Sequence, residues 1–171
     1  MSHPEFRRSQ NQNRSNQRMT ASLVMNPHPA VLHKDELIAA GIDKLMTLRY
    51  RNIPVVSDNG TYLGSFSMHC LLRLVLPKAV LVEGGLDTAP FVSDTLKDLR
   101  QRLKDVENKP VSYCLAQTDV SVVGPDTPLV ETLLALYHSH ASVPVVDPES
   151  QRLLGLVSYW DVGHKILEQT I

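Results

Sequence analysis

Two stretches of the chain repeat one pattern, and this repeat constrains the fold more than any other feature. The first reads IPVVSDNGTYLGSFSMHCLLRL and the second reads VPVVDPESQRLLGLVSYWDVGHKI. Pro54 and Pro144 are 90 positions apart, whereas Gly64 and Gly155 are 91 apart, so the turn of the second copy is one residue longer. A repeat of this kind indicates two copies of one unit that bury a shared core.

Each copy predicts the order strand, helix, strand, strand, helix. Residues 29–33 and 118–123 favour a short strand, and apolar residues at helical spacing follow in both copies. Asn59 and Gly60 form a hairpin signal in the first copy, and Asp147 and Pro148 supply turn residues in the second. One copy of roughly 50 residues would bury its helices and sheet poorly. We therefore expect an α+β fold in which two small sheets pack together with helices outside.

The connection between the copies, residues 77–110, is too long for a loop without structure of its own. Within residues 93–106, Leu96, Leu99, Leu103 and Val106 form a narrow apolar stripe at helical spacing. This pattern predicts an amphipathic helix over 93–106. Its stripe can pack on the chain's own body or meet a second subunit as a coiled-coil-like seam.

The repeated motif resembles a pair of CBS (cystathionine-β-synthase) domains, which is called a Bateman module. Each copy has an apolar residue followed by Pro-Val-Val, a turn, and then Gly and Ser separated by two residues, and the second copy adds Asp161 three residues after Ser158. The resemblance implies two βαββα repeats packed as a pseudo-two-fold pair, with an additional helix in the connection. It divides the chain into a tail (1–21), repeat 1 (22–76), the connection (77–110) and repeat 2 (111–171).

The resemblance also implies a function. Such pairs sense ligands rather than catalyse reactions, they commonly form homodimers, and they hold adenosyl compounds such as AMP, ADP, ATP or S-adenosylmethionine in clefts between the repeats. No catalytic arrangement of residues stands out in this sequence, which is consistent with a protein that is not an enzyme.

In the second copy, two side chains suit an adenosine phosphate. The Asp161 carboxylate can accept hydrogen bonds from both ribose hydroxyls, and Ser158 at a helix start can contact a phosphate together with free backbone N–H groups. An alternative role for Asp161 is that of an ordinary acid in the first helical turn. Tyr159 and Trp160 would lie at the mouth of the site, where Trp160 either stacks on a base or packs on the protein. By resemblance, further residues would flank the adenine or wall the site: Thr118, Val120, Ser142, Val143 and Pro144.

The corresponding site in the first copy is degenerate. Ser67 keeps the hydroxyl and Ile53 takes the place of Val143, but Cys70 stands where the family has aspartate. A thiol is too weak an acceptor to hold two ribose hydroxyls. We therefore expect at most one competent adenosyl site per chain.

The distribution of charge along the chain bears on which other classes of partner it can bind. The chain has 17 Lys and Arg against 18 Asp and Glu, but residues 1–20 carry a net charge of +3, which leaves −4 on the remaining 151 residues. The polar, arginine-bearing tail is predicted to be disordered, and nucleic acid is an unlikely partner for the acidic body. The sequence has no apolar run long enough to span a membrane, no secretory signal and no metal-ligand spacing at Cys70 and Cys114. These features favour a cytoplasmic protein with free thiols.

The leading hypothesis is a stand-alone regulatory module that requires no cofactor, binds an adenosyl nucleotide in one cleft and signals to an effector protein. Additional cations for a polyphosphate would come from Arg73, Lys78, His164 or a partner subunit. The alternative is a ligand-free scaffold for dimerisation or protein interaction. A third hypothesis, nucleic-acid binding through the tail, predicts strongly salt-dependent binding.

Overall fold

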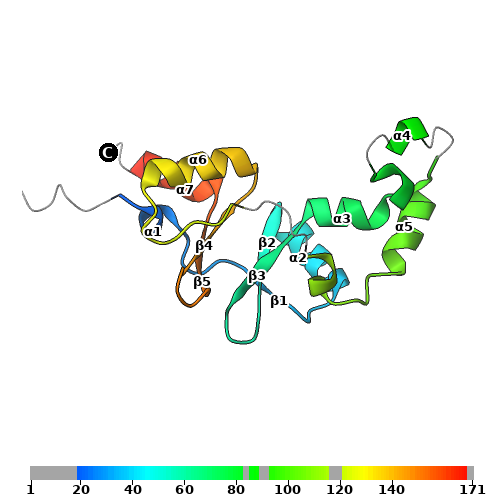
Figure 1. The fold of residues 1–171 in the computed structure, drawn as a ribbon, viewed down its shortest axis with the longest axis horizontal. Coiled ribbons are helices and arrows are strands. Elements are labelled where there is room, and N and C mark those ends of the chain that lie inside the picture. Colours follow the sequence, from blue (N-terminus) through cyan, green and yellow to red (C-terminus); the bar gives the residue numbers. More distant parts are fainter. Residues whose placement is uncertain (1–18, 83–84, 89–92, 116–120, 169–171) are drawn as a thin grey trace, which may run out of the picture.

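The computed structural model describes residues 19–82, 85–88, 93–115 and 121–168, and the chain forms two halves that follow the two repeats (Figure 1). Each half places two helices against a small sheet, which confirms the α+β fold with two related repeats. The first half contains β1 (Leu32–His33), α2 (Ile38–Leu48), β2 (Asn52–Val56), β3 (Tyr62–Ser67) and α3 (Met68–Val75). The second half contains α6 (Leu129–Ser139), β4 (Val143–Val146), β5 (Leu153–Val157) and α7 (Tyr159–Glu168).

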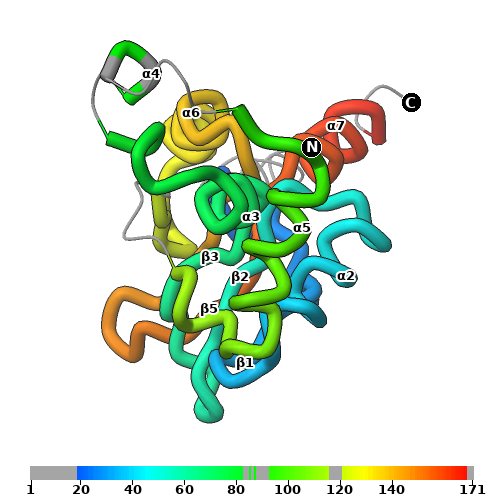
Figure 2. Tube along the Cα trace, turned by 90° about the vertical axis from the view of Figure 1, so that its right-hand side faces the viewer, coloured from blue at the N-terminus to red at the C-terminus, as the bar shows by residue number. Residues whose placement is uncertain are grey.

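The remaining helical elements lie before and between the halves. The helix α1 (Ala21–Val24) precedes the first half. The connection contains two short 3-10 turns, η1 (Lys78–Val80) and η2 (Val111–Cys114), and the helices α4 (Gly85–Thr88) and α5 (Leu96–Lys104). Figures 1 and 2 show that α4 and part of the connection extend away from the two sheets.

The sheets of the two halves share the same register. In the first, β1 pairs parallel with β2 and β2 pairs antiparallel with β3, with Val55 opposite Gly64. In the second, β4 pairs antiparallel with β5, with Val145 opposite Gly155. In both sheets the register shifts immediately after this pair. A single parallel bridge from Val123 to Val145 takes the place that β1 has in the first sheet.

Each half is completed by the segment that leads into the other repeat. We call residues 20–26 and 110–115 the lead-in segments. Ala21 and Val24 of the first lead-in segment belong to the apolar core of the second half, and Figure 1 shows α1 beside α6 and α7. Val111 and Cys114 of the second lead-in segment belong to the core of the first half. Neither half can therefore close its core without chain from the other side.

This exchange explains the second of the two repeated glycines. Asn26 pairs with Leu156 through two backbone hydrogen bonds of 2.8 and 3.0 Å, and so it passes directly over Gly155. A Cβ atom at Gly155 would lie 2.7 Å from the carbonyl oxygen of Asn26. At the equivalent Gly64, the nearest side chain is Leu115 of the other lead-in segment. Gly155 thus makes room for the first lead-in segment. At Gly64 a Cβ atom would lie 3.6 Å from Leu115, an ordinary contact distance, and the φ of 146° is what favours glycine there.

A buried asparagine joins the two halves at the start of β2. The Asn52 side-chain amide donates to the carbonyl oxygen of Ser142 at 3.1 Å, and its carbonyl accepts from the Ser142 N–H at 3.1 Å. Asn52 is 2% exposed, so both bonds are sheltered from water. The hairpin tips also pair, because Tyr62 N–H donates to the Gln151 carbonyl and Leu153 N–H donates to the Gly60 carbonyl. We call this set of contacts the seam.

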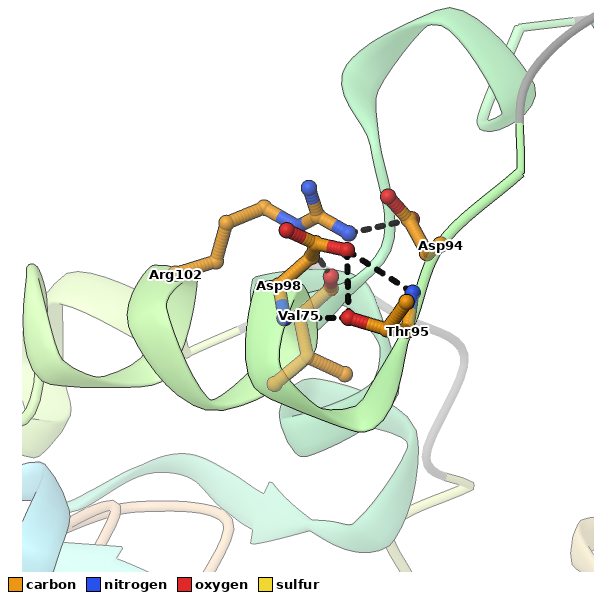
Figure 3. A network of polar contacts seen from close by, with 5 residues as sticks. All are labelled: Val75, Asp94, Thr95, Asp98 and Arg102. Atoms are coloured by element: carbon orange, nitrogen blue, oxygen red, sulfur yellow. Dashed lines mark hydrogen bonds and ion pairs between the residues drawn. The ribbon is translucent and has the colours of Figure 1, made fainter.

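The predicted connection helix forms as α5, and polar contacts fix its start (Figure 3). Thr95 and Asp98 form a capping box, in which each side chain accepts a hydrogen bond from the backbone N–H of the other residue. The hydrogen bonds from Thr95 lower the pKa of the Asp98 carboxyl. Arg102 forms an ion pair with Asp94 and donates to the carbonyl oxygen of Val75 at the end of α3.

The apolar stripe of this helix packs on its own chain at one end only. Leu103 and Val106 pack against the core of the first half, whereas Leu96 at the start of α5 is 84% exposed. One end of the stripe therefore packs on its own chain, whereas the Leu96 end is exposed, and contact with a second subunit stays a prediction.

The close contact at Gly155 leads to a test of the lead-in exchange. Gly155→Ala should destabilise the protein by about 2 kcal/mol, because the new methyl group forces the Asn26 backbone away from β5. Gly163→Ala is the matched control, since nothing lies within 4 Å of a Cβ there and alanine favours the interior of α7. Urea unfolding measures the free energy of unfolding of both variants. Equal stability of the two variants would contradict the exchange.

Candidate functional site

A cavity of about 480 Å³ lies on the seam and is lined by residues from both halves. We call it the cleft. Residues at the end of α2 line the cleft from the first half, and residues at the start of α7 line it from the second half. Residues next to Asn52 on the seam complete the lining. The lining residues are Asn26, Pro29, Arg49, Tyr50, Arg51, Ala141, Ser142, Leu156, Ser158, Tyr159, Trp160 and Asp161.

Ser158 and Asp161 hold each other at the start of α7. The Asp161 carboxylate accepts from the Ser158 N–H at 2.9 Å and from the Ser158 hydroxyl at 2.5 Å, and the Asp161 N–H donates to the Ser158 hydroxyl at 3.2 Å. All the carboxylate bonds use Oδ2. Among the described residues, no hydrogen bond reaches Oδ1, so this oxygen can still accept from a ligand. Asp161 therefore caps its own helix and also lines the cleft.

The cleft brings together four of the residues that the sequence selected: Ser142, Ser158, Tyr159 and Asp161. Trp160 joins them and is 76% exposed. The Tyr159 hydroxyl donates to the Leu136 carbonyl at 2.9 Å, which orients its ring. Two other predicted residues, Val143 and Pro144, are buried in β4 and do not line the cleft. The predicted residues Thr118 and Val120 lie outside the described residues.

The sequence reasoning missed the contribution of the first half to this cleft. Arg49, Tyr50 and Arg51 follow α2 and face the second half across the seam. The available signal was a pair of arginines immediately before the repeated Pro-Val-Val strand. The cations proposed from sequence do not line the cleft: these are Arg73, Lys78 and His164.

Arg49 is distinguished by its backbone conformation, and Arg51 by a hydrogen bond to the other half. Arg49 is the C-cap of α2 and has a left-handed backbone with φ of 55°. His140, the C-cap of α6, takes the same conformation with φ of 53°. Arg51 donates from Nη1 to the His140 carbonyl at 3.2 Å, which is another hydrogen bond across the seam.

The degenerate residues of the first repeat lie in or beside its core. Cys70 and Ile53 are fully buried, and Ser67 caps α3 by accepting from the Cys70 N–H at 3.3 Å. The Cys70 thiol donates to the Cys114 carbonyl at 3.0 Å, and Arg73 donates to the same carbonyl at 3.3 Å. A hydrogen bond with Cys70, and then burial, raise the pKa of the Cys114 thiol far above its usual range. Cys70 is therefore a core residue that ties α3 to the second lead-in segment.

No group of three or more His, Cys, Asp or Glu side chains in the described part of the chain could hold a metal ion. No described helix is both long enough and apolar enough to cross a membrane.

Comparison with known proteins identifies the repeat. The family model described as the CBS domain matches residues 21–77 and 103–168. The solved structure of CBSX2, a CBS-pair protein from Arabidopsis thaliana, is 21% identical with a TM-score of 0.66, and the match covers 88% of this chain and 96% of that one. No match was found among curated proteins.

Two other solved structures share the fold at a similar level of sequence identity. CBSX2 in complex with AMP is 20% identical with a TM-score of 0.63, covering 90% of this chain and 99% of that one. A CBS domain protein from Streptococcus pneumoniae is 19% identical with a TM-score of 0.59, covering 86% of this chain and 84% of that one. These likenesses establish the fold.

The burial of Cys70 generates a prediction. Cys70→Asp restores the acidic residue of the family motif, but it places a carboxylate in a fully buried position, where the nearby Arg73 is already bonded to the Cys114 carbonyl. We expect a loss of about 3 kcal/mol or more in the free energy of unfolding. Cys70→Ala is the control and should lose less, since it leaves only a small void and the Cys114 carbonyl keeps its hydrogen bond from Arg73. An aspartate variant as stable as the alanine variant would show that position 70 faces solvent or a ligand.

Proposed function

Because the chain belongs to the CBS-domain family, we propose that it is a regulatory module that binds an adenosyl ligand in the cleft. The observation that carries this proposal is the position of Ser158 and Asp161 in a cavity that both halves line. A ligand in such a cavity contacts both halves at once, so its occupancy depends on how the halves are arranged.

The polar groups of the cleft match the parts of an adenosine phosphate. Asp161 Oδ1 would accept hydrogen bonds from the ribose hydroxyls, while Oδ2 keeps the cap of α7. The N-terminal turn of α7 and the Ser158 hydroxyl would face a phosphate, which is the anion favoured at a helix start. Tyr159 and Trp160 offer rings at the cleft, and the aromatic face of Trp160 is open to stack on the adenine. The solved complex of CBSX2 with AMP supports this choice of ligand class.

The proposed mechanism is differential affinity. A ligand that binds one arrangement of the halves more tightly shifts the population toward that arrangement, and an effector protein reads the change. In this scheme the ligand is a signal, so no reaction is catalysed and no cofactor is required. The alternative is a ligand-free scaffold that uses the same halves only for protein interaction.

A ligand screen tests the proposal. AMP, ADP, ATP, S-adenosylmethionine and NAD are each added to the full chain, and the thermal unfolding midpoint is recorded. A ligand present at one hundred times its dissociation constant should raise the midpoint by about 5–10 °C, because it binds only the folded state. If none of the five raises it, the scaffold alternative replaces the sensor.

Variants locate the bound ligand. Asp161→Asn keeps an oxygen that can accept from the Ser158 N–H, but it removes the carboxylate, so the ligand-induced shift should be lost while the protein stays folded. Glu131→Gln is the matched control, since it neutralises an acid in the first turn of α6, outside the cleft. Loss of the shift in both variants would move the site elsewhere.

The proposal includes a homodimer through the outer face of the second half. Side chains with large exposed apolar surfaces gather on α6 and α7: Val130, Leu134, Tyr137, Ile166 and Leu167. Covering such a face removes apolar surface from water.

Sedimentation velocity tests this interface. The double variant Leu134→Glu with Leu167→Glu should sediment as a monomer, because charges would be buried without partners, whereas the unmodified chain should sediment as a dimer. Leu96→Glu on α5 serves as the control and should remain dimeric. Dissociation by Leu96→Glu alone would place the interface on the connection helix instead.

A further inference from the structure

The cleft carries two positive charges from the half that does not supply Ser158 and Asp161. We propose that Arg49 and Arg51 form an anion subsite that selects phosphorylated adenosine over neutral or cationic adenosyl compounds. This inference rests on the proposed function and narrows it to one ligand class, nucleotides that carry a phosphate.

The charges of the cleft favour an anion. Among its lining residues, two are cationic (Arg49 and Arg51) and one is anionic (Asp161), so the lining carries +1 in a chain of net charge −1. The negative charge of Asp161 is partly satisfied by the N–H and hydroxyl of Ser158. A nucleotide phosphate carries a charge of about −1.5 to −2 at neutral pH. S-adenosylmethionine has a sulfonium cation in the same region and a net positive charge despite its carboxylate, so the arginines would attract it less than they attract AMP.

The Arg49 guanidinium is available to a ligand. Among the described residues, none forms a hydrogen bond or an ion pair with this side chain. The planar fork of an arginine matches two oxygens of a phosphate, so the group suits a phosphate better than it suits a hydroxyl or an amine.

The backbone at Arg49 is unusual for a residue with a side chain. Helices often end in a left-handed residue, and glycine is preferred there because it has no Cβ atom. The chain keeps an arginine at φ of 55° in this position. His140 ends α6 in the same conformation, so the left-handed cap belongs to both repeats, and in the first repeat the residue that carries it lines the cleft.

Arg51 links the subsite to the seam. One of its nitrogens, Nη1, donates to the His140 carbonyl at 3.2 Å, and a guanidinium has five N–H donors, so others remain for a ligand. A phosphate between the arginines and the start of α7 would be held from both halves. Ligand charge would therefore strengthen the contact between the halves, which is the property that a sensor needs.

Binding measurements separate this subsite from the rest of the cleft. The dissociation constants of AMP, adenosine and S-adenosylmethionine are measured by calorimetry, with the fluorescence of Trp160, the chain's one tryptophan, as a second readout. The unmodified chain should bind AMP at least about tenfold more tightly than adenosine or S-adenosylmethionine. The double variant Arg49→Gln with Arg51→Gln should lose about tenfold or more for AMP and keep its affinity for adenosine.

Three controls make the outcomes distinct. Arg100→Gln removes one positive charge on α5, outside the cleft, and should leave all three constants unchanged. Arg49→Gln alone leaves the seam bond of Arg51 intact, so a selective loss for AMP in this variant cannot come from a weakened seam. Raising the salt concentration should weaken AMP binding more than adenosine binding.

Equal affinity of the unmodified chain for AMP and adenosine would overturn the subsite and leave the proposed function standing. The same holds if the double variant loses both ligands to the same extent. No binding of these three compounds, together with no binding of ADP, ATP or NAD in the ligand screen, would overturn both the subsite and the proposed function.

Discussion

The two hydrogen bonds between the Asn52 side chain and the Ser142 backbone fix the relation between the halves, and the rest of the structure depends on that relation. Each half has a small sheet and needs the other repeat's lead-in segment to close its core. Asn52 is the first residue of β2, and Ser142 directly precedes β4. The two hydrogen bonds between them therefore fix the position of β2 relative to β4. A buried polar pair of this kind specifies a single arrangement, since any slip leaves both partners unpaired.

The cleft follows from that arrangement. Because the halves meet at the starts of β2 and β4, the end of α2 faces the beginning of α7. A helix end presents free carbonyl groups and a helix start presents free N–H groups, so the two helices bring unlike chemistry to one cavity. Side chains add further polar groups at both helix ends: two arginines follow α2, and Ser158 and Asp161 lie at the start of α7. The Ser158–Asp161 contact holds the acid in place before a ligand arrives, which lowers the entropy lost on binding.

The sequence predicted those features that depend on residues close together along the chain. The repeat, the order of elements and the pairing of Ser158 with Asp161 all follow from residues a few positions apart. It did not predict contacts between distant segments. The two lead-in segments exchange between halves, and nothing in the local pattern of Ala21 or Val111 indicates which core each one enters. Arg49 and Arg51 were missed for the same reason, since they are remote in sequence from the motif that they face. The connection helix forms over Leu96–Lys104, which is shorter than the predicted 93–106, and the two ends of its apolar stripe have different environments.

The number of ligand molecules bound per chain tests the central claim most directly. Cys70 lies in the core of the first half, whereas Asp161 lines the cleft, so the proposed function predicts one adenosyl site per chain. Calorimetric titration of the full chain with AMP should therefore give a stoichiometry of one. A stoichiometry of two would show that the first repeat binds as well despite its cysteine, and no heat or saturation at any AMP concentration would remove the ligand from the account.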